Sequence, residues 1–158
     1  MTSSSIRPAH RVGAVALLAG AAVLLAACTT PPKPDPYAHL ATFTTRLAGS
    51  NEVPPVASMA TGTVDAVLDR KTYLLRWKMA YENLSGPATM AHFHGPAPIG
   101  SNAPPVIAFT LPVTPAYEGR ATLTPAQAAD LLAGRWYVNV HTARHPGGEI
   151  RGQMIERR

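Results

Sequence analysis

The sequence is almost without cysteine, because Cys28 is the only one among 158 residues. A single thiol excludes an intrachain disulfide bond and a metal site built from several cysteines. A folded domain in this chain must therefore be held together by its hydrophobic core, or by that core and a metal ion bound by other side chains.

Charged residues are also few, at 15% of the chain. The formal net charge is +5, but Arg7 and Arg11 lie in a segment that we expect to be removed, which leaves twelve basic residues against nine acidic ones. The remaining charges are scattered, without the basic run or basic helix face typical of a nucleic-acid-binding protein. We therefore expect no nucleic acid among the partners.

The sequence also lacks the short motifs of several common enzyme classes. It contains no GxSxG, HExxH, GxGxxG or Walker pattern, so it gives no support to a serine hydrolase, a zinc protease or a phosphate-binding loop. Enzymatic activity stays open at this point, with binding favoured over turnover.

One long apolar run does occur, at residues 12–27, and it follows a short basic N-terminus. The run is shorter than the roughly 20 residues that span a bilayer and is typical of a secretory signal. It ends in Leu25-Ala26-Ala27-Cys28, which resembles the bacterial lipobox. This resemblance implies cleavage before Cys28 and acylation of its thiol and its new amino group, enough for stable anchoring. We therefore predict a lipoprotein signal peptide at residues 1–27.

Residues 28–38 are then expected to form a lipidated cysteine and a tether. Four prolines between Thr29 and Ala38 favour an extended polyproline II conformation and supply no core. Thr29 replaces the Asp that the usual sorting rule for such lipoproteins associates with the inner membrane. We expect a lipid-anchored protein of the cell envelope, on the periplasmic face of the outer membrane where the cell has two membranes.

Residues 39–158 show the alternation of apolar and polar residues that is typical of half-buried strands. Leu75, Trp77 and Met79 share one face, whereas Arg76 and Lys78 share the other. Turn-forming residues separate the expected strands, which lie near residues 41–46, 63–68, 73–81, 88–94, 106–111, 119–123, 136–141 and 149–155. The pattern predicts an all-β domain, an antiparallel β-sandwich with one short helix.

The helix is expected directly after Thr124. Thr124 is a favourable N-cap, Pro125 suits the first helical position and Gln127 completes a capping box. Gly134 is a typical C-terminal stop. The segment predicts a helix of about nine residues that covers one end of the sandwich.

Histidine is the residue type that points to chemistry. Two clusters hold the four histidines of the domain beyond the tether, His92 with His94 and His141 with His145. In a strand, His92 and His94 point to the same face with their Cα atoms about 6.5–7 Å apart. His141 ends a later strand and can supply a third imidazole, whereas His145 can reach the same place or face water. Imidazole suits copper, zinc and nickel, and we rank copper first and zinc second.

Other side chains near these clusters are weaker candidates for a functional role. Met90 lies two residues before His92 and offers a thioether suited to Cu(I), although a core methionine is the alternative. Glu52, Glu149 and Arg151 lie in turn-rich motifs. We expect them to be structural, with a buried carboxylate against Arg151 or backbone N–H groups, tying the final strand to the loop at residues 51–55.

Several motifs together resemble the CHRD domain, a module first named from the animal protein chordin and widespread in bacterial exported proteins. They occur in the family's order, from Leu47-Ala48-Gly49-Ser50-Asn51-Glu52-Val53-Pro54-Pro55 through Ala91-His92-Phe93-His94-Gly95-Pro96 and Trp136-Tyr137-Val138-Asn139-Val140-His141-Thr142 to Pro146-Gly147-Gly148-Glu149-Ile150-Arg151-Gly152-Gln153. The resemblance covers about residues 40–155 and implies an all-β module. It does not settle function.

The histidine pattern is also distantly similar to the copper half of copper/zinc superoxide dismutase, a Greek-key sandwich. The bridging histidine, the zinc loop and the disulfide cysteines of that enzyme have no counterpart here. Three functions therefore remain: a membrane-anchored copper-binding domain, a metal-free module that recognises a protein or a glycan, and a single-metal redox enzyme. The identity of any protein partner stays open.

Overall fold

The computed structural model describes residues 1, 33 and 35–157. The chain divides into two units, Met1–Lys33 and Pro34–Arg158, and the second is the folded domain. Cys28 and, apart from Met1, the expected signal peptide lie outside the described residues. Within the part that is described, no helix has both the length and the apolar character needed to cross a membrane.

The described part of the domain contains nine strands, one α-helix and one 3-10 helix. The strands are β1 (Leu40–Ala48), β2 (Thr61–Asp69), β3 (Leu74–Glu82), β4 (Ala88–His94), β5 (Pro105–Ala108), β6 (Ala116–Thr122), β7 (Trp136–Thr142), β8 (Ile150–Met154) and β9 (Glu156–Arg157). The helices are η1 (Gly49–Asn51) and α1 (Pro125–Leu132).

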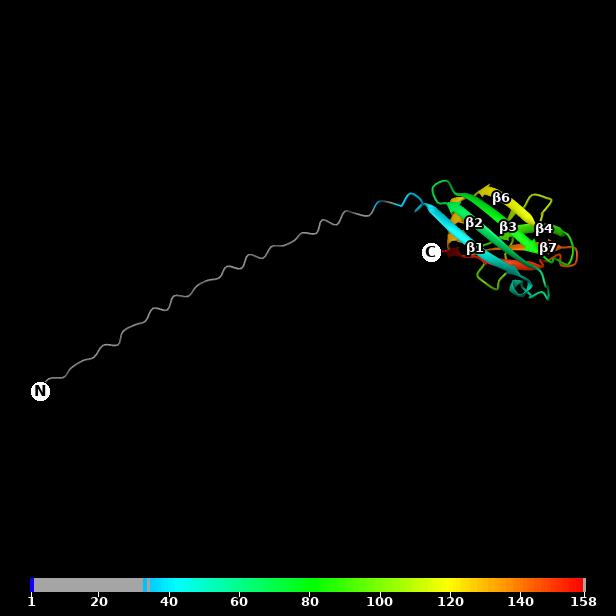
Figure 1. Ribbon diagram of the computed structural model, residues 1–158, viewed down its shortest axis with the longest axis horizontal. Coiled ribbons are helices and arrows are strands. Elements are labelled where there is room, and N and C mark those ends of the chain that lie inside the picture. Colours follow the sequence, from blue (N-terminus) through cyan, green and yellow to red (C-terminus); the bar gives the residue numbers. More distant parts are fainter. Residues whose placement is uncertain (2–32, 34, 158) are drawn as a thin grey trace. The chain divides into compact units, whose positions relative to one another are not determined.

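All strands belong to one antiparallel sheet in the order β5-β4-β7-β8-β1-β2-β3-β6, with β9 paired to β1. Figure 1 shows β1, β2, β3 and β6 side by side. The sheet curls into a nearly closed, barrel-like layer with β5 and β6 at its edges. The expected all-β antiparallel fold with one short helix is therefore confirmed.

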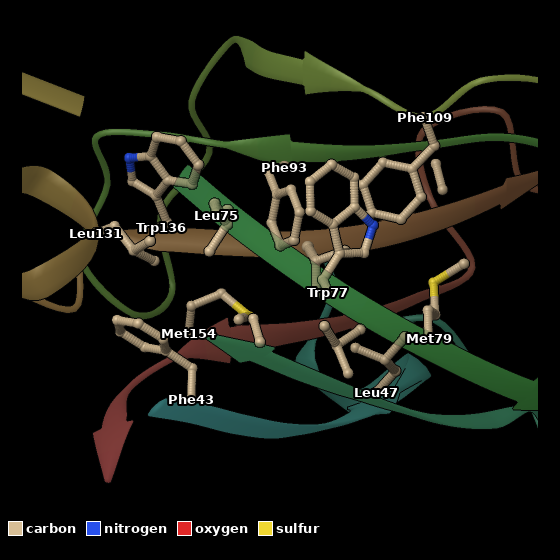
Figure 2. Close-up of a cluster of buried hydrophobic side chains, with 14 of the residues drawn as sticks. Phe43, Leu47, Leu75, Trp77, Met79, Phe93, Phe109, Leu131, Trp136 and Met154 are labelled. Carbon is tan, nitrogen blue, oxygen red and sulfur yellow. The ribbon is translucent and has the colours of Figure 1, made fainter. Parts of the chain in front are cut away.

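The hydrophobic core explains why the sheet curls. Alternate residues of strands from both halves of the sheet point inward, as the period-two pattern predicts, and join one cluster (Figure 2). Its largest fully buried apolar members are Trp136, Phe43, Phe93, Leu47, Leu68, Leu75, Leu131, Ile150, Met154, Val64 and Val138.

Helix α1 begins as the sequence predicts. The Thr124 side chain accepts a hydrogen bond from the Gln127 backbone N–H, and the Gln127 side chain accepts one from the Thr124 N–H. Leu131 is fully buried, and Gly134 follows the helix with a φ of +69° that favours glycine.

Some strand boundaries differ from those expected. Tyr73 has a φ of +57°, so it belongs to a turn and β3 begins one residue later. Strand β5 ends at Ala108, three residues short of the expected end. The pairing of β9 with β1 was not expected from the sequence.

Strand β7 is buried on both faces, in contrast to the half-buried strand that was expected. One face belongs to the core, and the other carries Asn139 and His141. The loop at residues 95–104 covers this second face, because Tyr137 donates a hydrogen bond to the Ala103 carbonyl and Gln153 donates one to the Ala97 carbonyl. The domain therefore has a polar interior beside its apolar core.

Trp77 of β3 fixes the apolar side of the strand that carries His92 and His94. Its ring meets Phe93 edge-on, with 5.1 Å between ring centroids (Figure 2). Trp77 is paired with Gly119 of β6, and its indole fills the space that a side chain at that position would take.

We predict that Gly119→Ala lowers the free energy of unfolding by about 1–3 kcal/mol, a typical cost of overpacking. The added Cβ would lie 2.3 Å from Cζ2 of Trp77, so the indole has to move. Gly86→Ala is the matched control, since a Cβ there meets nothing within 4 Å. Denaturant unfolding measures both, and equal stabilities would contradict the prediction.

Candidate metal centre

Antiparallel pairing of β4 with β7 assembles the candidate site. His92 lies directly opposite Asn139, and His94 lies opposite Tyr137. Because side chains two residues apart share a face, His141 joins the same side as Asn139. The sheet thus places the His-x-His pair beside the third imidazole that the sequence indicated.

The three imidazoles converge on one point. Nδ1 of His92 lies 3.1 Å from Nε2 of His141, and the rings of His92 and His94 are 5.5 Å apart between centroids. One ligand atom from each of His92, His94 and His141 lies within 4.8 Å of the other two. In the described chain, no other group of three or more His, Cys, Asp or Glu side chains comes together in this way.

Backbone carbonyls fix the tautomers of two of these rings. The Ala103 carbonyl oxygen lies 2.9 Å from Nδ1 of His94, and the Pro146 carbonyl oxygen lies 2.9 Å from Nδ1 of His141. A carbonyl can only accept, so both Nδ1 atoms carry the proton and both Nε2 atoms keep a free lone pair. A histidine that binds a metal ion through one ring nitrogen usually donates the N–H of the other nitrogen to such an acceptor.

Burial keeps the three imidazoles neutral. His94 and His141 are 8% and 6% exposed, and His92 is half-buried. Removal from water is the largest cause that lowers the pKa of each ring, followed for His92 by the neighbouring imidazoles. Since a metal ion binds only the deprotonated imidazole, the lowered pKa values favour metal binding at neutral pH.

Asn139 occupies the centre of the cluster. Its Oδ1 atom lies 3.0 Å from Nε2 of His94 and 2.9 Å from Nε2 of His141. The residue is 2% exposed, and its amide hydrogen-bonds the Glu52 carboxyl group on the other side. Asn139 therefore links the imidazoles to a buried acid.

Two buried residues of opposite formal charge, Glu52 and Arg151, border the imidazoles. Burial raises the pKa of Glu52, and the positive charge of Arg151 partly offsets this effect. The Arg151 guanidinium lies over the Tyr137 ring, 3.3 Å from its centroid, and Tyr137 stacks on His94 at 4.6 Å. Arg151 also donates hydrogen bonds to Asn102 and to the Ser101 carbonyl.

Glu149 does not pair with Arg151, which was one of the two alternatives expected from the sequence, and lies in a separate pocket lined by hydroxyl groups. Its carboxylate accepts hydrogen bonds from the hydroxyl groups of Ser58, Ser85 and Thr142 and from the Ser85 N–H. Burial alone would raise the pKa of Glu149, but these donors outweigh it and lower the pKa to about 2. The fully buried carboxylate stabilises the turn that follows β7.

The remaining candidates lie outside the imidazole cluster. His145 occupies the turn after β7, where its backbone N–H bonds to Thr142, and it is not among the clustered histidines. Met90 is paired with His141 but is 42% exposed. Arg151 remains tied to the 51–55 loop, because its carbonyl accepts a hydrogen bond from Asn51.

Sequence reasoning missed Asn139 and the Ala103 carbonyl. Asn139 was detectable, because it precedes His141 by two residues and therefore shares its face. The position of Ala103 depends on how the 95–104 loop folds over β7, and no short-range pattern predicts this.

We predict that Glu149→Gln lowers the free energy of unfolding by about 3 kcal/mol at pH 7. The folded pKa lies below the ordinary value of 4.5, so the ionised carboxylate stabilises the fold above pH 4.5, and this contribution disappears as the pH falls toward 2. The difference between the variants should shrink over the same range in denaturant unfolding. Metal affinity should stay within about tenfold, since Glu149 contacts none of the three imidazoles.

One family model matches most of the folded domain. The model of the CHRD domain family matches residues 43–154, a range that includes all three clustered histidines, Asn139 and the acidic motifs. No curated protein and no solved structure matches the chain, so the likeness to superoxide dismutase stays untested. The chain belongs to the CHRD domain family.

Proposed function

We propose that this domain binds one transition metal ion through His92, His94 and His141, with copper as the first choice and zinc as the second. The observation that carries the proposal is the convergence of three neutral imidazoles whose ligand atoms lie within 4.8 Å of one another. The role would be copper binding, buffering or delivery in the cell envelope.

The ligand set supports a borderline metal ion. Imidazole nitrogen suits copper, zinc and nickel, and copper binds most tightly among divalent ions at a given site of this kind. Hard oxygen-seeking ions such as Mg²⁺ and Ca²⁺ prefer carboxylates and carbonyls, and neither Glu52 nor Glu149 is grouped with the three imidazoles.

The uneven burial of the ligands supports exchange of the ion. His94 and His141 are buried and held by backbone carbonyls, whereas His92 is half-buried. An ion would therefore enter and leave from the side of His92. A metal-free interaction module is the alternative function. Metal titration of histidine variants distinguishes it from a metal-binding domain.

We expect each of the changes His92→Ala, His94→Ala and His141→Ala to weaken Cu(II) and Zn(II) binding more than about 100-fold, above the effect of typical outer-shell residues. Isothermal titration of the purified protein measures this. Double variants should lose much less than the sum of the single losses, because the first change already dismantles a cooperative site.

His145→Ala is the matched control, since His145 lies outside the cluster, and its affinity should stay within about tenfold of the wild type. Acidification should release the ion, because protons compete for the imidazoles, and release should occur well below their ordinary pKa of about 6.5, since burial lowers the pKa of each ring. Wild-type protein that binds neither ion more tightly than His92→Ala would contradict the metal site and favour the interaction module.

We further propose that the domain is carried on an envelope lipoprotein, anchored through Cys28. The support is the lipobox-like sequence Leu25-Ala26-Ala27-Cys28 at the end of the only long apolar run, followed by a proline-rich segment. This anchor would hold a metal-binding domain close to the membrane surface.

Cys28→Ser should abolish lipidation and leave an uncleaved precursor, because the modified thiol is absent. Radiolabelled fatty-acid incorporation and the mass of the membrane-bound protein report this, with Thr29→Ser as the control that keeps the cysteine. Normal processing and normal membrane fractionation of Cys28→Ser would exclude the anchor.

A further inference from the structure

The side-chain oxygen of Asn139 faces two imidazole nitrogens, and all three atoms carry lone pairs. Its Oδ1 atom lies 3.0 Å from Nε2 of His94 and 2.9 Å from Nε2 of His141. Both Nδ1 atoms donate their proton to backbone carbonyls, so neither Nε2 has a proton to give. Three electron-pair acceptors thus face one another without a hydrogen between them, which is repulsive unless a cation lies among them.

Reversal of the amide would remove the repulsion, because Nδ2 would then donate to both rings. Glu52 opposes this reversal. Its carboxyl group hydrogen-bonds the Asn139 side chain, and a carboxylate needs the donor end of the amide. Glu52 is 5% exposed and its Oε1 atom has no hydrogen-bond partner among the described residues, so loss of the Asn139 donor would leave the acid poorly satisfied.

The backbone of the turn before β8 holds this pair in place. A Cβ on Gly148 would lie 2.4 Å from Oε1 of Glu52 and 2.6 Å from Nδ2 of Asn139. Gly148 also has a φ of +125°, which side-chain-bearing residues rarely adopt. Both the close contact and the positive φ require glycine at position 148. The Asn139 amide therefore lies packed between this turn and the imidazoles.

We propose that Oδ1 of Asn139 is the fourth ligand of the metal ion, beside His92, His94 and His141, and that Glu52 orients it. This inference rests on the proposed function. Neighbouring atoms of this set are separated by 2.9, 3.0 and 3.1 Å. Ligands about 2.0–2.1 Å from one ion lie about 2.8–3.4 Å apart at angles of 90–109°.

The fourth ligand narrows the choice of ion. Three imidazoles and an amide oxygen form a set of borderline and hard donors, whereas Cu(I) prefers sulfur. The nearest thioether along β4, Met90, is 42% exposed and outside this set. The site should therefore select Cu(II) or Zn(II) over Cu(I).

The test is Cu(II) titration and electron paramagnetic resonance on the full chain with Asn139→Ala. We expect a loss of at least about tenfold in affinity and a changed copper hyperfine pattern, because an oxygen ligand is removed. Asn139→Asp keeps a ligand oxygen and should bind Cu(II) more tightly than Asn139→Ala. Affinity and spectrum unchanged in Asn139→Ala, with binding still lost in His94→Ala, would overturn the fourth ligand and leave the three-histidine site intact.

Gly148→Ala and Gly147→Ala provide a second test that leaves all four ligands in the chain and applies even where Asn139→Ala fails to fold. Gly148→Ala should displace Glu52 and Asn139 and alter the copper spectrum, whereas Gly147→Ala, whose Cβ meets nothing within 4 Å, should match the wild type. Identical copper spectra for the two glycine variants would overturn the proposal that Asn139, oriented by Glu52, is a ligand. A wild type that binds no ion would overturn this inference together with the proposed function.

Discussion

Burial of both faces of β7 is the constraint on which the rest of the structure depends. Apolar side chains satisfy the inner face, but the outer face carries Asn139 and His141, and buried polar groups need partners. The 95–104 loop and the turn after β7 supply them, because the Ala103 carbonyl accepts a hydrogen bond from Tyr137 and the Pro146 carbonyl accepts one from His141. These connections therefore complete the interior of the domain as much as the strands do.

The buried charges divide into two systems with different tasks. Glu149 is surrounded by hydroxyl donors and has no basic partner among the described residues, which suits a purely structural acid. Glu52 faces Asn139 and the charge of Arg151 and keeps an oxygen without a partner. Within the described residues, only the Glu52 system reaches the imidazole cluster, through the Asn139 side chain.

The sequence predicts the parts of this site that follow from local periodicity. The period-two pattern places His92 and His94 on one face, and the capping signals define helix α1 from Thr124. The same pattern does not predict that a loop covers the outer face of β7, because loop placement depends on contacts distant in sequence. This is why the tautomers of His94 and His141 and the partners of Glu149 could not be derived before the fold was known.

Sheet register ties the imidazole cluster to the apolar core. A one-residue shift in the pairing of β4 with β7 would turn imidazoles toward the core and turn Phe93 or Val138 away from it. The core contacts of Phe93 and Val138 therefore also fix the positions of the imidazoles. The positions of the three imidazoles are consequently set by apolar packing on the other face of the same strands. Under the proposed function, a site held by such packing would gain and lose an ion without unfolding the domain, unlike small zinc domains that fold only when loaded, and this is the property that buffering or delivery requires.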